Sequence, residues 1–198
     1  MRDWSLASHR REEGSGALGL VAGTVPPAYA ERMLGLTTLG VFHTAISLVA
    51  VAAGFFALVR DKEISWRNGV GKLYVVTTVI TCLTGFGIFQ HGGFGKPHAL
   101  GIITLVALVV AGIAGYSRSF GRISRQVEIV SYSATFLFHW IPAVTETTTR
   151  LPVGAPLFPD AEAPGLQLVS AVLFALFLVG VVLQLRRLRA QQQAVLAI

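Results

Sequence analysis

The fold is decided by residues 36–59, which read LTTLGVFHTAISLVAVAAGFFALV and contain no charged side chain. A helix of this length rises about 36 Å, which is enough to cross a hydrocarbon core of about 30 Å. Further apolar runs of comparable character cover about 73–89, 98–115, 127–144 and 166–185. The sequence therefore predicts an all-α integral membrane protein with five transmembrane helices.

The composition agrees with this fold class. The 198 residues are 53% hydrophobic and 13% charged, whereas soluble domains average about 45–50% and about 25%. Lys and Arg outnumber Asp and Glu by 16 to 10, but in a membrane protein such an excess sets orientation. We expect the lipid bilayer as a partner, no nucleic acid and no separate soluble catalytic domain.

The connections predict how the helices are arranged. Short polar loops at 60–63, 91–97 and 117–122 make sequential helices antiparallel. The predicted architecture is a four-helix transmembrane bundle over 36–145, a Pro-rich outer loop over 146–165, a fifth transmembrane helix over 166–185 and a tail over 186–198. Pro142 lies inside the fourth span and is expected to kink that helix or to end it early.

Residues 1–35 are predicted to form an extramembrane arm that lies on the membrane surface. The apolar run 17–25, followed by AYA at 28–30, imitates a signal peptide. Nine apolar residues are too few to span, and residues 10–13 carry both charge signs. We therefore expect this segment to be retained, against the membrane or a partner.

Basic residues predict the orientation. They gather on the side that carries the first and third loops and the C-terminus, namely Arg60, Lys62, Arg67, Lys72, Arg118, Arg122, Arg125, Arg186, Arg187 and Arg189. The positive-inside rule places this side in the cytoplasm, with the C-terminus there and the N-terminus outside.

Four of the five histidines are predicted to converge on the outer half of the bundle: His43, His91, His98 and His139. An imidazole within a span is costly unless it has a partner, so the default interpretation is a site. His43 and His139 are expected at equal depth, as a b-type haem between helices would need. Three or four imidazoles, together with Glu146, would instead suit a zinc, copper or iron ion.

A plainer interpretation stays open for the same residues. His43 and His139 would then only form hydrogen bonds with neighbouring helices, while His91 and His98 would lie at the level of the lipid head groups.

These observations favour a redox or electron-transfer protein that holds haem b or a transition-metal ion. The alternative is a non-catalytic accessory subunit, which docks on a larger membrane complex through its arm, Pro-rich loop and fifth helix. A transporter or channel ranks last, because the spans show no repeats, in-membrane acids or charged pathway. The sequence does not decide whether the protein is an enzyme.

Other residues are assigned to packing. Cys82, the single cysteine, is expected to be a buried core residue. Gly112 and Gly115 are expected to permit close helix approach. Trp66 and Tyr74 are expected in the aromatic belt at the cytoplasmic interface.

Several short motifs resemble a family of bacterial membrane proteins called domain of unknown function 2306. The motifs are GKLYV at 71–75, KPHAL at 96–100 with Thr104 following, SY at 131–132 and TRLP at 149–152. The resemblance covers about 36–152, and within it His43 and His98 match family positions. It implies the fold and a bacterial inner (plasma) membrane, but it carries no activity. The chain departs from the family where RN at 67–68 and SRQ at 124–126 replace histidine-containing sequences.

Overall fold

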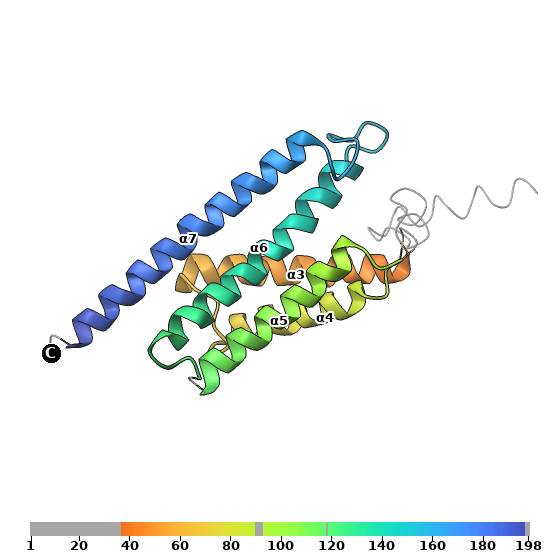
Figure 1. Ribbon diagram of the computed structural model, residues 1–198. Coiled ribbons are helices and arrows are strands. Elements are labelled where there is room, and N and C mark those ends of the chain that lie inside the picture. Colours follow the sequence, from red (N-terminus) through yellow and green to blue (C-terminus); the bar gives the residue numbers. More distant parts are fainter. Residues whose placement is uncertain (1–36, 90–92, 118, 197–198) are drawn as a thin grey trace, which may run out of the picture.

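The computed structural model describes residues 37–89, 93–117 and 119–196, which are helical with no strand (Figure 1). The helices are α3 (Thr38–Asp61), α4 (Gly69–Gly85), α5 (Lys96–Ser117), α6 (Ser124–Arg150) and α7 (Pro164–Leu196), with a 3-10 turn, η2 (Gly121–Ile123), before α6. The prediction of an all-α fold is confirmed. The arm over 1–35 lies outside the described residues.

Four of these helices, α3, α5, α6 and α7, are long and apolar enough to cross a membrane. The fifth, α4, has 17 residues and rises about 26 Å, slightly less than a hydrocarbon core. Large apolar side chains such as Phe55, Leu83, Val109 and Leu176 are exposed on the outside of the molecule. Outward apolar faces on long helices are those of a multi-pass protein in a lipid bilayer.

Helices α3 to α6 form a bundle in which each packs against its neighbour in sequence and α6 closes onto α3. Helix α7 packs on α6 from outside the bundle (Figure 1). The predicted four-helix bundle with one peripheral helix is therefore present. Its centre is built from alanine, larger aliphatic and tyrosine side chains: Ala53, Ala57, Ile64, Tyr74, Leu108, Ala111 and Tyr132.

Local polar groups set where two of the helices begin. The Thr37 hydroxyl accepts a hydrogen bond from the Gly40 N–H at 3.1 Å and caps α3. The Asn68 amide oxygen accepts from the Gly71 N–H at 2.8 Å and caps α4. Helix α3 ends at Asp61, and the next residue, Lys62, has a left-handed φ of 65°. These caps start α4 at Gly69, four residues before the apolar run that predicted it.

Two helices extend beyond their predicted ends. Helix α6 continues eight residues past Pro142 to Arg150, so the expectation of an early end is wrong. Beyond the proline, the Thr145, Thr148 and Thr149 hydroxyls each donate to a carbonyl of their own helix. Helix α7 continues to Leu196, through the segment expected as a tail, because Arg, Gln and Ala are good helix formers in water.

The two ends of the bundle carry different contacts. At one end, the basic end, the Gln184 side chain donates to the Lys62 carbonyl at 3.0 Å and Arg187 donates to the Asp61 carbonyl at 2.9 Å. At the other, the histidine end, Lys96 pairs with Glu162 at 2.8 Å. The α3–α4 loop and the C-terminal part of α7 thus share one end, as the sequence predicted.

Two packing expectations change. Tyr74 is fully buried in the bundle centre, so its assignment to the aromatic belt is wrong. Gly115 does not bring two backbones together, because a Cβ there would lie 2.7 Å from the Glu128 Oε1 atom. The glycine makes room for a carboxylate. Cys82 is buried, as expected.

Candidate functional site

The structure places three of the predicted histidines near or inside the histidine end of the bundle. His43 lies in the second turn of α3, His98 near the start of α5 and His139 in the middle of α6. His91 lies outside the described residues. Among the described residues, no group of three or more His, Cys, Asp or Glu side chains is arranged to hold a metal ion.

His43 is tied to α4 by a threonine. Its Nδ1 atom lies 3.0 Å from the Thr84 Oγ1 atom. The Thr84 hydroxyl already donates its one proton to the Ile80 carbonyl at 2.8 Å, with the Thr81 carbonyl at 3.0 Å. Thr84 must therefore accept from His43. This assigns the His43 proton to Nδ1 and leaves a lone pair on Nε2.

His139 is held in the same way but through its other nitrogen. Its Nε2 atom lies 3.0 Å from the Thr78 Oγ1 atom, and the Thr78 hydroxyl donates to the Tyr74 carbonyl at 2.7 Å. His139 is therefore the donor, with its proton on Nε2 and its lone pair on Nδ1. Tyr74 also packs edge-on against the imidazole, with ring centroids 6.0 Å apart. Both intramembrane imidazoles have hydrogen-bond partners on α4.

The two imidazoles do not lie at the same depth. Their partners Thr78 and Thr84 are six residues apart on α4, which is about 9 Å along the helix axis. Helix α6 also ends later than expected, so His139 lies about three turns from the C-terminal end of that helix. The expectation of equal depth is wrong.

This arrangement does not fit a haem held between His43 and His139. The Nε2 atom of His139 is engaged by Thr78, and the space between α3, α4 and α6 is filled by side chains. A Cβ added at Gly54 would lie 2.6 Å from the Phe136 ring and 2.9 Å from the Tyr74 ring.

His98 occupies a separate aromatic setting at the start of α5. Its ring stacks on Phe89 at 5.0 Å and lies 5.2 Å from the Phe94 ring. The Gly95 N–H donates to its Nδ1 atom at 3.2 Å, which places the proton on Nε2. That buried Nε2–H has no acceptor within the described part of the chain. The structure does not bring His98 into one group with His43 and His139.

Glu146 lies near the C-terminal end of α6, where its side chain is 52% exposed and pairs with Arg150. It is within electrostatic range of His43. Beside this imidazole is Gly85, where a Cβ would lie 3.2 Å from the His43 Cε1 atom. The absence of a side chain at Gly85 thus leaves room for the His43 ring.

A constant register relates α4 to α6. Three side-chain contacts join α4, or the loop just before it, to α6: Arg67 to Glu128, Tyr74 to Thr135 and Thr78 to His139, each with a sequence separation of 61. A constant separation means that the helices run parallel. Both helices pack on α3 and α5, so these contacts cross the bundle along its diagonal. Seven residues beyond Thr78, the same register sets Gly85 opposite Glu146.

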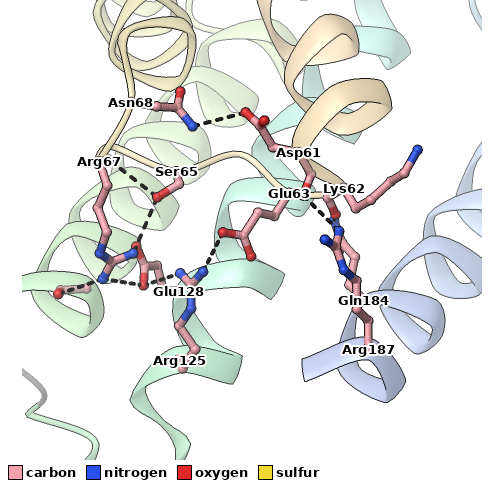
Figure 2. Close-up of polar contacts among 11 residues, drawn as sticks. Asp61, Lys62, Glu63, Ser65, Arg67, Asn68, Arg125, Glu128, Gln184 and Arg187 are labelled. Atoms are coloured by element: carbon pink, nitrogen blue, oxygen red, sulfur yellow. Dashed lines mark hydrogen bonds and ion pairs between the residues drawn. The ribbon is translucent and has the colours of Figure 1, made fainter. Parts of the chain in front are cut away.

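The first of these contacts belongs to a charged cluster that the sequence analysis missed (Figure 2). The Glu128 carboxylate is 3% exposed and accepts from Arg67 at 2.7 and 3.1 Å and from Arg125 at 2.8 Å. Arg125 also pairs with Glu63 on the loop after α3. The cluster therefore joins the α3–α4 loop to the start of α6.

Arg67 reaches further across the basic end. It donates to the Ser65 hydroxyl at 3.3 Å and to the Gly115 carbonyl, at the end of α5, at 3.1 Å. A buried carboxylate is stable only with such charged and hydrogen-bonded partners. Glu128 falls inside the predicted span 127–144, so the premise that the spans lack an acid is wrong. A lone acid in an apolar run was the available signal.

At the histidine end, the Lys96 ammonium holds the pKa of the Glu162 carboxyl below its ordinary value, through their hydrogen bond and charge attraction. Both side chains are mostly exposed, so this pair fixes the loop before α7 only weakly.

Comparison with known protein families, curated proteins and solved structures gives no match for this chain. The resemblance to domain of unknown function 2306 therefore stays a prediction.

Proposed function

We propose that this protein binds a transition-metal ion at the histidine end of its bundle and takes part in membrane redox or electron transfer. The observation that carries the proposal is the fixed tautomer of His43, whose Nδ1–H is held by Thr84. Metal-ligating histidines are commonly oriented by a hydrogen bond from the nitrogen that does not bind the metal. His43 Nε2 is then the ligand atom.

Glu146 is the candidate second ligand. It lies within electrostatic range of His43, and the register of α4 and α6 sets it opposite Gly85. Glu146 pairs with Arg150, one helical turn away on α6. This pairing would have to open when the ion binds. His139, deeper in the bundle, offers its Nδ1 lone pair. Imidazole and carboxylate ligands suit zinc, copper or iron.

Haem b is not part of the proposal, because the Nε2 atom of His139 is engaged by Thr78. The remaining group that would suit His43 and Glu146 is a single ion.

The test is metal analysis and an oxidised-minus-reduced visible spectrum of the full chain, purified in detergent. We expect stoichiometric metal in the wild type, its loss in His43→Ala and its retention in His98→Ala, the matched control at the same end. A colourless, metal-free wild type that also fails to bind added Cu²⁺, Zn²⁺ or Fe²⁺ would overturn the proposal.

A second candidate is an accessory subunit of a membrane complex, and α7 is the observation that favours it. This helix packs mainly on α6, and Leu168, Val172, Leu176, Val179 and Leu183 are exposed along it. Lipid or another subunit would cover this face. Co-purification from native membranes tests the candidate: truncation after residue 165 should release any partner that α7 holds.

We further propose that the protein lies in a bacterial inner membrane with the basic end in the cytoplasm. Support comes from the concentration of Lys and Arg at that end.

A further inference from the structure

The basic end contains an open cleft that the histidine site does not use. Its volume is about 380 Å³, and its walls come from the end of α5, from η2, from the start of α6 and from the C-terminal part of α7. The charged and amide side chains that line it are Arg67, Arg122, Arg125, Glu128 and Gln192.

The arginines of this cleft differ in how many of their N–H groups remain available to a ligand. Arg67 makes hydrogen bonds to Ser65, Gly115 and both oxygens of Glu128, which occupy four of its five N–H groups. Arg125 uses one terminal nitrogen on Glu128 and the other on Glu63. Arg122 is exposed and makes no hydrogen bond or ion pair with the described part of the chain. Within the described residues, all five of its N–H donors therefore lack a partner.

The net charge of the cleft and the dipole of α6 also favour an anion here. Arg67 and Arg125 are balanced by Glu128 and Glu63, so Arg122 leaves one positive charge in excess at the cleft. No side chain caps the start of α6, because the N-cap residue is Ile123, and the Ser124 hydroxyl accepts from the Phe120 N–H. The positive end of the helix dipole therefore also faces this region.

We propose that this cleft binds a phosphate group, with Arg122 as its principal ligand and Arg125 and the Gln192 amide as supporting donors. Arginine presents a planar fork of donors that matches phosphate oxygens. The cleft lies at the end of the spanning helices, where lipid head groups and soluble phosphates are both within reach. The group is that of an anionic lipid or of free phosphate. The proposal does not depend on the histidine site.

The test uses the full chain in detergent and compares Arg122→Gln with Arg189→Gln. Both variants remove one exposed arginine from the basic end, but Arg189 does not line the cleft. The probes are inorganic phosphate against chloride at equal ionic strength, and phosphatidic acid against phosphatidylcholine. Binding is measured by the rise in thermal unfolding temperature with probe concentration.

We expect the wild type and Arg189→Gln to be stabilised equally, and Arg122→Gln to bind at least about ten-fold more weakly. A response to phosphatidic acid alone assigns the site to lipid, and a response to inorganic phosphate alone assigns it to a soluble ligand. The absence of any response, or an equal loss in Arg122→Gln and Arg189→Gln, would overturn the proposal.

Discussion

The histidines of this chain show how one hydroxyl decides the chemistry of an imidazole. Thr78 and Thr84 each donate to a carbonyl of α4 and so can only accept from a histidine. The positions of His43 and His139 in their spans could be predicted from the sequence. Their partners could not, because a threonine in an apolar helix satisfies its hydroxyl within its own backbone, whether or not a histidine faces it.

This leads to a prediction for Thr84→Val, which removes the acceptor of the His43 Nδ1–H at nearly constant volume. We expect a stability loss of about 1 kcal/mol and, if an ion binds, an affinity loss of about 10–100-fold. The control is Thr77→Val on the same helix, since the Thr77 hydroxyl bonds only to its own helix. Equal effects of the two substitutions on metal affinity, measured by titration, would contradict the assigned role.

A second prediction concerns Glu128. Replacing it by Gln leaves Arg67 and Arg125 without their shared carboxylate, so we expect the free energy of unfolding to fall by about 3 kcal/mol. The Arg67 side chain is 54% exposed. Water around it keeps the expected loss at the lower end of the range for buried ion pairs. Thermal unfolding in detergent measures it. Glu162→Gln, which removes an exposed ion pair, is expected to change the free energy of unfolding little. A loss in Glu162→Gln equal to that in Glu128→Gln would contradict the stabilising role of the buried carboxylate.

A third prediction is a pH effect at the loop before α7. Lys96 lowers the pKa of Glu162 in the folded protein. The pair therefore contributes its full stabilisation above the pKa of Glu162 in the unfolded chain, which is about 4.3. This stabilisation is lost as the pH falls through the pKa of Glu162 in the folded protein, which is lower. Carboxyl-selective NMR should show Glu162 titrating below about 4.3, and returning towards it in Lys96→Gln. Titration at the same pH in both proteins would refute the pairing in solution.

At the scale of the elements, spans were easier to predict than ends. Apolar length located all five helices, but α4 begins at its Asn68 cap and α6 passes through Pro142. Proline removes one backbone bond, which a long packed helix can tolerate, so it marked no end here. The register between α4 and α6 could not be predicted either, because it depends on these two helices facing each other across the diagonal of the bundle.

The start of α4 supplies a fourth prediction. A Cβ at Gly71 would lie 1.9 Å from the Ser65 carbonyl oxygen, whereas nothing lies within 4 Å of a Cβ at Gly69. Gly71→Ala must displace backbone, so we expect a loss of about 3 kcal/mol. Gly69→Ala, two residues away on the same helix, should be neutral or slightly stabilising. Unfolding in SDS or urea compares them, and equal stability would show that the loop shifts freely.

For the whole molecule, the charge distribution and the structure agree on which segments share an end. The α3–α4 loop, η2 and the C-terminal part of α7 meet around Arg67, Glu128 and Gln184. The Pro-rich loop lies with the start of α5, through Lys96 and Glu162. The bundle thus has one strongly basic end and one end with the histidines, and only the side of the membrane for each stays a prediction.

The fifth prediction tests that side. In a Cys82→Ser background, single cysteines at Ser119 and Gln193 lie at the basic end, and one at Asp160 lies at the histidine end, all at exposed positions. Because Lys and Arg are retained on the cytoplasmic side, a membrane-impermeant maleimide should label only Asp160→Cys in intact cells with a permeable outer membrane. Lysis should expose the other two. Labelling of Ser119→Cys and Gln193→Cys in intact cells, with Asp160→Cys protected, would invert the orientation and move the phosphate cleft outside.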